Sequence, residues 1–477
     1  KCPLDQDKFR YVKCKSEIDL LTKFINWWNN PNHTPDVLSG WNIEFFDIPY
    51  LVNRVRKIFG EEDTKFFSPW GIINEQTVTK FNREQQKYEL VGIQTLDYYK
   101  LFTKFGYSYG PQESYSLDHI SNVVLGEKKL SYEEHGSLHS LYLNDYQKFI
   151  DYNIKDVQLV QRIDEKMQLI ALAMTIAYRA GVNYTDTFGT TAIWDSIIYR
   201  KLNEQNIIVP PNETKSKSQF AGGYVKDPVP GLYGNVASFD LNSLYPNIIV
   251  QYNISPETLI KDERYHDGVD NYLENDLPPH PKHCNTVNGT LYSKEKRGFL
   301  PEIIIDYYDE RAGIKKIMLA AESDYQKNPT FELEKEISQL QNKQMAIKIL
   351  MNSMYGALGS QYFRYFDVRM AEAITLTGQY SIRLAERAVN TELNKLLENK
   401  KDYVIAIDTD SVYIDFDDWV KKFNPAKPME FLDKTCSEHF EKVIAKEYDK
   451  LKTNTNAYEN RMWMGREVLA DKGIWTA

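Results

Sequence analysis

Two carboxylates one residue apart interrupt an apolar strand pattern in the C-terminal part of the chain. Residues 404–407 (VIAI) are followed by Asp408 and Asp410, and apolar alternation then resumes in VYIDF. This alternation predicts two strands, with the acidic residues at the tip of the hairpin that joins them. Like charges this close repel one another. The tip is therefore either a site that a cation neutralises or a polar turn, in which Asp is common.

A third carboxylate lies at the end of another strand-like segment. Residues 235–250 (NVASFDLNSLYPNIIV) are predicted to be strand-like, and Asp240 ends the apolar part before a turn. Three carboxylates at strand ends, without His or Cys, suit Mg²⁺ rather than zinc. Two such ions about 4 Å apart are the arrangement that supports phosphoryl transfer.

A helical hairpin supplies cations. Residues 302–322 and 331–357 show helical periodicity and are joined by KNPT, which predicts two antiparallel helices. Four side chains stand at helical spacing on these two segments: Arg311, Lys315, Lys348 and Asn352. Together they would form a cradle for a triphosphate, in which Arg gives a bidentate grip and Lys a point charge. Taken singly, each is more typical of a solvated helix face, and it is their combination with the three carboxylates that weakens this interpretation.

Composition excludes several classes of protein. The 477 residues suffice for roughly two to four domains. A hydrophobic content of 42% and a charged content of 26% are typical of a soluble globular protein, and no apolar run or signal-peptide pattern predicts a membrane segment or secretion. Four cysteines without a C-x-x-C pair indicate a reducing compartment. The net charge of −9 argues against a global positive field for nucleic acid, so basic contacts must be local.

Three motifs, in this order, resemble those of family B DNA polymerases, closest to the replicative enzymes of large tailed phages. SFDLNSLYPNII is similar to the family's first palm motif, KILMNSMYGALGS to its fingers motif and AIDTDSVYI to its second palm motif. The resemblance implies a multidomain protein of α/β and α+β class. A partial RNase H-like 3′–5′ exonuclease domain would precede a polymerase palm with inserted helical fingers.

The same resemblance implies roles for individual palm and fingers residues. Asp240 and Asp410 would be ligands of two catalytic Mg²⁺ ions, and Asp408 would support them near the primer terminus. The triphosphate would be held by the backbone amides from Leu241 to Tyr245, assisted by the Ser243 hydroxyl. The residues expected to bind nucleotide are Leu241, Ser243, Leu244, Tyr245, Arg311, Lys315, Lys348 and Asn352.

Further residues of the motifs would contact sugar, base pair and template. Tyr245 is similar to the family's steric gate, whose ring fills the space that a ribose 2′-hydroxyl needs. Tyr355 and Gly356 would lie against the nascent base pair. The segment FAGGYVK resembles the family's Tyr-x-Gly-Gly linker to template, with Phe220 in place of the Tyr and Gly222 and Gly223 as the two glycines.

The N-terminal part resembles an incomplete editing site. GWNIEFFDIPYLVNR and YNIKDVQLV are similar to the second and third exonuclease motifs, with Asp47 and Asp156 as metal ligands. Asn42 would position the substrate strand, Tyr152 would orient the attacking water, and a hairpin over 71–92 would help separate primer from template. No Asp-x-Glu on a strand precedes Asp47, so two further Mg²⁺ ions are expected only if that motif is supplied.

The expected domains follow from these motifs: exonuclease 1–170, helical connector 171–211, palm 212–297, fingers 298–360 and palm 361–477. Only 36 residues separate Arg311 from Lys348, which is short for the phage branch. The chain is expected to be a fragment of a longer polymerase, without the thumb, or one piece of a split polymerase. Expected partners are primer–template DNA, dNTPs, a sliding clamp and other replisome proteins, with no membrane, in the cytoplasm, which for a virus is that of the host.

Three other functions remain open. An inactive polymerase-like scaffold could bind DNA or a replisome partner, but would have no physical reason to keep buried charges such as Asp240 and Asp410. A nucleotidyl cyclase-type palm would not need the exonuclease-like part or the helix that carries Lys348. A standalone nuclease is disfavoured by the missing Asp-x-Glu.

Overall fold

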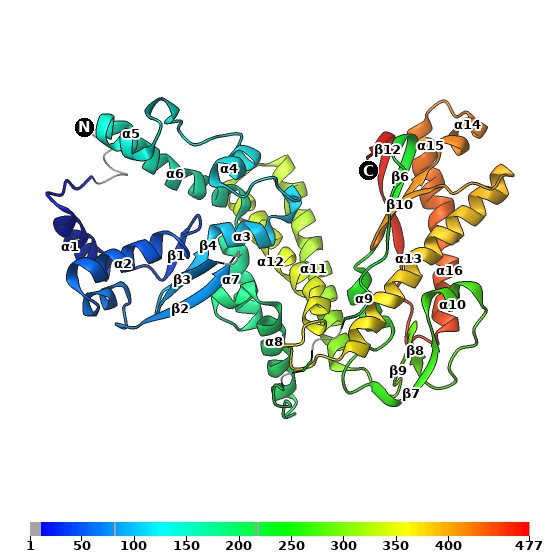
Figure 1. The fold of residues 1–477 in the computed structure, drawn as a ribbon. Helices are drawn as coiled ribbons and strands as arrows, with labels where there is room; N and C mark the ends of the chain where they lie inside the picture. Colours follow the sequence, from blue (N-terminus) through cyan, green and yellow to red (C-terminus); the bar gives the residue numbers. More distant parts are fainter. Residues whose placement is uncertain (1–10, 81–82, 214, 217–218, 477) are drawn as a thin grey trace. The chain divides into compact units, whose positions relative to one another are not determined.

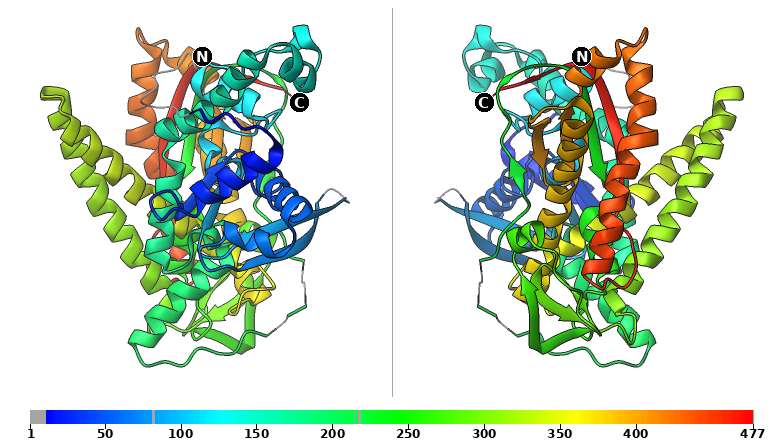
Figure 2. Two further views of the ribbon diagram at one scale, coloured as in Figure 1. Left: turned by 90° about the vertical axis from the view of Figure 1, so that its left-hand side faces the viewer. Right: turned by 90° about the vertical axis from the view of Figure 1, so that its right-hand side faces the viewer.

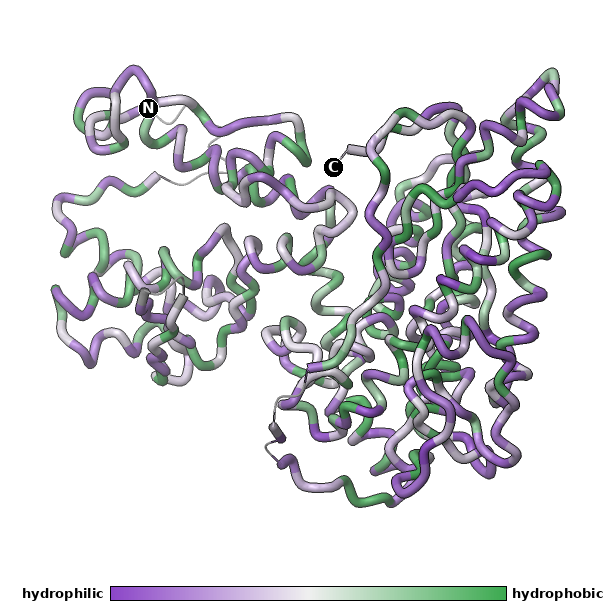
Figure 3. The backbone as a smooth tube through the Cα atoms, turned by 45° about the vertical axis from the view of Figure 1, so that its right-hand side comes forward, coloured by the Kyte–Doolittle hydropathy of each residue, from purple (hydrophilic) through white to green (hydrophobic). Residues whose placement is uncertain are grey.

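The chain forms two compact units, residues 1–189 and 190–477 (Figure 1). The structure is a computed structural model that describes residues 11–476 apart from 81–82, 214 and 217–218. Within this described part, none of the helices is long and apolar enough to cross a membrane. The long helices carry both hydrophilic and hydrophobic positions along their length (Figure 3). Each unit is described by itself below.

Unit 1 combines helices with short strands. Its helices are α1 (Glu17–Trp28), α2 (Asp47–Phe59), α3 (Tyr98–Phe105), α4 (Leu117–Leu125), α5 (Leu138–Asn144), α6 (Tyr146–Met167) and α7 (Leu169–Ala180). Its strands are β1 (Val37–Gly40), β2 (Ile73–Lys80), β3 (Arg83–Leu90) and β4 (Gln94–Asp97). β1 and β4 pair in parallel, and β2 and β3 form a separate antiparallel hairpin. The hairpin expected over 71–92 is therefore confirmed, and its turn at 81–82 lies outside the described residues.

The core of unit 1 packs α1 and α2 against the base of the hairpin. Apolar residues three and four positions apart on the two helices make this possible, because they share one helix face. The buried cluster comprises Leu21, Trp28, Ile43, Ile48, Val52, Val55, Phe67, Tyr88, Leu90 and Ile93. Apolar residues at three- and four-residue steps in residues 137–174 would suggest one long helix, but the structure divides this segment among α5, α6 and the start of α7. Asp145 caps α6 by accepting from the Lys148 amide, and Gln168 ends it in a left-handed conformation at φ 56°.

Unit 2 contains a five-stranded antiparallel sheet in the order β12-β6-β11-β10-β5, and a small sheet β7-β9-β8. The strands are β5 (Val225–Lys226), β6 (Gly231–Leu241), β7 (Leu259–Asp267), β8 (Cys284–Asn285), β9 (Asn288–Tyr292), β10 (Val404–Asp408), β11 (Ser411–Asp415) and β12 (Met464–Trp475). The helices are α8 (Thr190–Glu204), α9 (Leu244–Gln251), α10 (Val269–Glu274), α11 (Phe299–Lys327), α12 (Phe331–Leu358), α13 (Val368–Leu397), α14 (Asp417–Phe423), α15 (Pro428–Thr435) and α16 (Glu441–Asn454).

Two long helices form the predicted hairpin. α11 and α12 run side by side and project from the rest of unit 2 (Figure 2). Thr330 in the connection caps α12, because its hydroxyl oxygen accepts a hydrogen bond from the Leu333 amide at 3.3 Å. Both the expected helices and the KNPT turn are confirmed. The long helix α13, which packs against α9 and α16, was not foreseen from the sequence.

One strand prediction was too long. The apolar segment 235–250 is strand only to Leu241, after which Ser243 adopts φ 47° and α9 begins. Nearly every side chain of α9 is buried, polar ones included: Leu244, Pro246, Asn247, Ile248, Ile249, Val250 and Gln251. A segment that is buried on all sides has no apolar stripe, so periodicity cannot distinguish a helix from a strand there.

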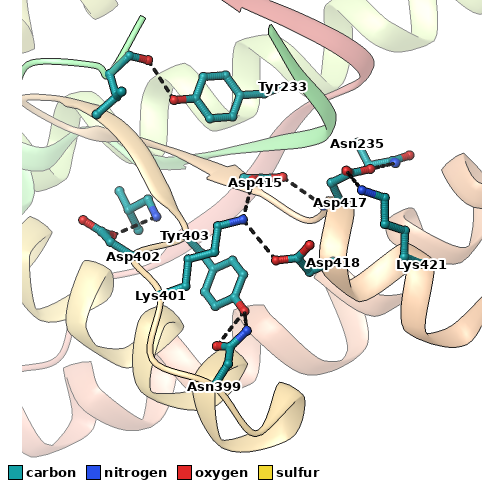
Figure 4. Close-up of polar contacts among 12 residues, drawn as sticks. Tyr233, Asn235, Asn399, Lys401, Asp402, Tyr403, Asp415, Asp417, Asp418 and Lys421 are labelled. Carbon is teal, nitrogen blue, oxygen red and sulfur yellow. Dashed lines mark hydrogen bonds and ion pairs between the residues drawn. The ribbon is translucent and has the colours of Figure 1, made fainter. Parts of the chain in front are cut away.

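An ion network closes the base of the β10–β11 hairpin (Figure 4). Lys401, just before β10, lies 3.1 Å from the carboxylate of Asp415 and 3.0 Å from that of Asp418. Asp415 also accepts from the amide of Asp417, the first residue of α14. Asn235 of β6 donates to the Asp417 carboxylate at 3.0 Å. The network ties the end of β11 to the neighbouring strand and helix, at the opposite end of the hairpin from its acidic tip.

Candidate active site

The acidic residues predicted from the sequence meet at one end of the five-stranded sheet. Asp240 of β6 pairs with Ser411 of β11 and with Gly465 of β12. The Ser411 hydroxyl donates to Oδ1 of Asp240 at 3.1 Å. The Leu241 amide donates to the carbonyl oxygen of Asp410 at 2.9 Å, which holds the β10–β11 turn against the end of β6. The sheet therefore brings together residues that are 170 positions apart in the sequence.

The charges at this site are not balanced by the protein. Burial, followed by the charges of Asp240 and Asp408, raises the pKa of Asp410 to about 6. Burial also raises the pKa of Asp240, although the Ser411 hydrogen bond and the charge of Lys348 oppose this shift. Both carboxylates would gain from a cation between them. Among the described residues no group of three or more His, Cys, Asp or Glu side chains forms a metal-ligand set, so any further ligands would come from backbone, water or substrate.

Glu467 is a fourth acidic residue at this end of the sheet, and sequence reasoning missed it. Its charge adds to the shifts that raise the pKa values of Asp240 and Asp410, of which burial is the largest cause. β12 pairs Arg466 with Phe239 and Val468 with Ser238, so Glu467 is the extra residue of a β-bulge. A bulge depends on pairing between distant strands, and no local pattern in GREVL predicts it.

The helical hairpin brings its expected side chains to one face. Nε of Arg311 on α11 donates to Gln344 of α12 at 3.2 Å. Gln344, Lys348 and Asn352 are successive turns of α12, so Arg311 lies one turn from Lys348 along this face. Lys315 is one turn further along α11 and exposed. Lys348 is close enough to Asp240 for its charge to act on that carboxyl.

The nucleotide-binding prediction needs one correction at the start of α9. The Leu241 amide was expected among the triphosphate donors, but it already donates to the Asp410 carbonyl oxygen, and the Asn242 amide donates to that of Trp463 at 3.1 Å. Both amides therefore form hydrogen bonds within the protein, at the end of β6, and not with a nucleotide. The remaining expected donors are the amides of Ser243, Leu244 and Tyr245, at the N-terminal end of α9.

The ring of Tyr245 is confined by its neighbours. Its centroid lies 4.6 Å from that of Tyr355 on α12, at an interplanar angle of 42°. A Cβ on Gly378 of α13 would come within 3.2 Å of the Tyr245 ring, and a Cβ on Gly223 within 3.2 Å of its hydroxyl. Burial raises the pKa of Tyr245 to about 12, so the hydroxyl stays neutral. Tyr245 therefore forms a wall that cannot turn aside freely.

The linker before β6 lies beside the C-terminal end of α12. A Cβ on Gly359, directly after α12, would come 3.2 Å from the Phe220 ring. Phe220 lines a cavity of about 610 Å³ together with Gln219, Gly359, Ser360, Gln361, Tyr362 and Phe366. Gly356, two residues before the end of α12, is exposed, and a Cβ there would meet no atom within 4 Å.

Comparisons with known proteins agree with this geometry. Residues 187–455 match the model of DNA polymerase family B, and residues 4–120 match that of the family B exonuclease domain. This chain belongs to DNA polymerase family B. The match to the polymerase model spans Asp240, helices α11 and α12 and the Asp408–Asp410 turn in a single stretch.

Several curated polymerases are similar over most of the chain. The DNA-directed DNA polymerase of Escherichia phage RB69 is 34% identical over 529 residues, covering 98% of this chain and 58% of the relative. That of Enterobacteria phage T4 is 32% identical, covering 97% and 56%. DNA polymerase II of Escherichia coli is 26% identical, covering 87% and 46%. The chain thus spans little more than half the length of the phage relatives. The alignment with the RB69 polymerase, at 529 residues, is longer than this chain of 477 residues. The RB69 polymerase therefore has segments, within the aligned region, that this chain lacks.

In the exonuclease-like part of this family B chain, the second motif is a well-held loop. Asn42 follows β1 with φ 64°, and its amide donates to Oδ1 of Asp97 at 2.9 Å. The Glu44 amide donates to Oδ2 of the same carboxylate at 3.1 Å. The Glu44 side chain is buried against Lys87 and Lys100. Asp47 opens α2, and burial raises the pKa of its carboxyl.

The third motif presents its carboxylate to a lysine. Asp156 on α6 forms an ion pair with Lys129 at 2.7 Å, and Nζ of Lys129 lies 3.4 Å from the Tyr152 hydroxyl. Burial opposes the charge of Lys129, but Asp156 outweighs it and the pKa of the lysine is raised. Among the described residues, no hydrogen bond, ion pair or charge interaction joins Asp47 to Asp156. Sequence reasoning missed both Asp97 and Lys129, which lie outside the two motifs.

Proposed function

We propose that unit 2 carries the nucleotidyl-transfer site of a template-directed DNA polymerase that acts in replication. The single observation that carries this proposal is the pair Asp240 and Asp410, half-buried side by side at the end of one sheet, with a pKa of about 6 for Asp410. Two carboxylates held together without a neutralising partner of their own suit two Mg²⁺ ions. When bound, these ions would lower the pKa of a primer 3′-hydroxyl and neutralise charge on the phosphates.

The protein residues would position the reactants. The 3′-oxygen of the primer attacks the α-phosphorus of a dNTP in line, the bond to the β-phosphate oxygen breaks, and pyrophosphate leaves. Arg311, Lys315, Lys348 and Asn352 on one face of the helical hairpin would grip the triphosphate. The amides that open α9 would bind it from the other side, because the first N–H groups of a helix have no partner within the helix. Asp408, exposed at the tip, would lie near the primer terminus.

Selection of deoxyribose would depend on Tyr245. Its ring is bounded by Tyr355, Gly378 and Gly223, so an added 2′-hydroxyl would meet a wall that cannot move away. Tyr355 and Gly356 would then face the nascent base pair. Phe220, Gly222 and Gly223 would contact the template, and Phe220 has no hydroxyl with which to donate a hydrogen bond.

Unit 1 is proposed to derive from the 3′–5′ exonuclease domain, in the RNase H-like arrangement that its β1–β4 parallel pair would share. Asp47 and Asp156 would be metal ligands there, Asn42 would position the strand and Tyr152 would orient water. The Asp156 carboxylate forms an ion pair with Lys129. Metal binding at Asp156 would therefore require the lysine to move away or a further pair of carboxylates to be supplied. The finer boundaries 170, 211, 297 and 360 stay part of this proposal, as do palm and fingers as names for the regions.

The proposed partners are primer–template DNA, dNTPs, a sliding clamp and other replisome proteins, in the cytoplasm. A scaffold that binds DNA without catalysis is the alternative. It is disfavoured because the charged carboxylates of Asp240 and Asp410 lower the stability of the folded protein, and a scaffold without a metal would gain nothing from them in return.

The test is metal-dependent nucleotide binding by the full chain. Calorimetry with dATP and Mn²⁺ should show binding that is lost in Asp410→Asn and in Lys348→Met. Lys343→Met is the matched control, an exposed lysine on the same helix but on another face, and should bind normally. Substitution of Tyr245 by Ala should narrow the preference for dATP over ATP. Equal binding by wild type and Asp410→Asn would refute the proposal and favour the scaffold.

A further inference from the structure

The turn between the two acidic residues contains a strained residue. Thr409, between Asp408 and Asp410, has φ 51°, in the left-handed region. A β-branched residue rarely adopts this conformation, and it persists only where surrounding structure enforces it. The Asp410 amide lies 2.5 Å from the Asp408 carbonyl oxygen, so the turn is also tight. Asp408 pairs with Ser411, so Thr409 is the first central residue of a two-residue hairpin turn, a position where the turn requires a positive φ. Contacts from outside the turn that support this conformation offset its cost for a β-branched residue.

The linker around residues 222–226 supplies such contacts. The Thr409 amide donates to the Tyr224 carbonyl oxygen at 3.0 Å. Directly beside this bond, β5 pairs with β10, so that Asp408 lies opposite Val225. The far end of the linker is fixed by Lys226, whose Nζ lies 2.6 Å from the carboxylate of Glu386 on α13 and 2.5 Å from that of Asp402.

Close approach of the linker depends on one of its two glycines. A Cβ on Gly223 would lie 2.8 Å from Oγ1 and 3.0 Å from Cγ2 of Thr409. A Cβ at this position would force the Thr409 side chain or the backbone to shift, so glycine lets the linker reach the turn without displacing Thr409. Gly222, the neighbouring glycine, has open space where a Cβ would stand. Its carbonyl oxygen accepts from Gln379 at 2.7 Å, a contact that alanine would keep.

We propose that Gly223 is a positioning residue: it lets the linker hold Thr409 in its left-handed conformation and thereby sets the direction of the Asp410 carboxylate. This inference rests on the proposed function, in which Asp410 binds metal. The same glycine also faces the Tyr245 hydroxyl. Gly223 therefore lies next to both the Thr409 turn and the ring that is proposed to select the sugar.

The experiment measures Mn²⁺ affinity of the full chain without DNA, by electron paramagnetic resonance. The signal counted is the part that Asp410→Asn removes. We expect Gly223→Ala to weaken that binding by about tenfold, since one enforced backbone conformation is worth about that factor. Gly222→Ala, the matched control, should bind Mn²⁺ as the wild type does, because a Cβ there meets no atom and its proposed template contact is not made in the absence of DNA. In a Thr409→Ala background, Gly223→Ala should have little further effect, because the side chain that it strikes is gone.

Hydrogen exchange gives a second test, which uses the unsubstituted chain and so does not depend on whether a variant folds. In the unsubstituted chain, the Thr409 amide should exchange at least about tenfold more slowly than an exposed turn amide, because it is bonded to Tyr224. Exchange at the rate of an open turn would overturn the inference. So would equal Mn²⁺ affinity in Gly223→Ala and Gly222→Ala while Asp410→Asn still abolishes binding. If Asp410→Asn leaves Mn²⁺ binding unchanged, the proposed function itself fails.

Discussion

The two carboxylate sites of this chain differ in how their charge is balanced. In unit 2, burial raises the pKa values of both Asp240 and Asp410, and the charge of Asp240 raises that of Asp410 further. In unit 1, Asp156 is paired with Lys129, and Glu44 with Lys87 and Lys100. A half-buried pair of carboxylates without a cationic ion-pair partner is costly for the protein alone and becomes favourable when a cation binds. A carboxylate that already has its lysine gains less from a metal.

The largest expected difference between the sites is catalytic. Asp410→Asn should lower primer extension in the presence of Mg²⁺ by about a thousandfold or more, the scale expected when a group that stabilises transition-state charge is removed. Asp156→Asn should leave primer extension within about twofold, because unit 2 does not use it. Extension assays on a primed template, with dNTP saturation confirmed for each variant, measure both. Comparable losses in the two variants would contradict the assignment of the chemistry to unit 2.

In the metal-free chain at pH 8, replacing an aspartate by asparagine should increase stability at the unit 2 site and decrease it at the unit 1 site. The folded pKa of Asp410 is about 6, above its ordinary 3.8, so the folded chain binds the extra proton between these pH values. Stability from this group therefore increases as the pH falls from about 7 to about 4. Asp410→Asn removes the penalty and should stabilise unit 2 by about 1–2 kcal/mol at pH 8, allowing for partial exposure, with the gain vanishing near pH 4.

Thermal melting with a chelator present, at pH 8 and pH 4, measures this difference. Asp156→Asn is the matched control, because it breaks an ion pair and should destabilise unit 1 at pH 8. A loss of stability in Asp410→Asn at pH 8 would mean that the protein itself already compensates the Asp410 charge.

A smaller effect on stability should distinguish Lys129 in unit 1 from Lys348 in unit 2. Lys129→Met leaves the Asp156 carboxylate partly buried without its partner and should cost about 1–2 kcal/mol of unfolding free energy. Lys348 forms no ion pair with any described residue, so Lys348→Met should change stability by less than about 0.5 kcal/mol. Nucleotide binding should show the reverse order. Chemical denaturation and dATP calorimetry on the same two variants give both numbers, and a stability loss at Lys348 as large as at Lys129 would argue that Lys348 is structural.

The sequence predicted the parts of unit 2 whose pattern is local. The helical hairpin, the β10–β11 strands and the acidic tip all follow from periodicity and turn chemistry over short windows. The strand-like run 235–250 failed because complete burial removes the apolar stripe that would identify α9 as a helix. The long helix α13 went unpredicted although Asp367 caps it, accepting from the Arg369 amide.

The candidate site was predictable where its residues belong to motifs, and not where they depend on register. The Leu241 amide was assigned to nucleotide, but its partner is set by the way the Asp410 turn docks on β6. Lys129 and Asp97 act on motif residues from 27 and 55 positions away, and a lysine or aspartate alone carries no signal at that range. The hydrogen bond that supports the positive φ of Thr409 likewise comes from the linker, at Tyr224, which no window around Asp408 contains.

The smallest expected effect concerns Glu467, which the β12 bulge places at the unbalanced site. Because it is exposed, its charge acts on Asp240 and Asp410 through solvent and should matter little. Glu467→Gln should weaken Mn²⁺ binding by about threefold at low salt and less at high salt. Glu44→Gln in unit 1 provides the contrast, because Glu44 is buried between two lysines and its loss should reduce stability without changing Mn²⁺ binding at Asp410. A tenfold or larger loss of Mn²⁺ affinity in Glu467→Gln, independent of salt, would instead make Glu467 a direct ligand, and the site would then hold its cations with three carboxylates rather than two.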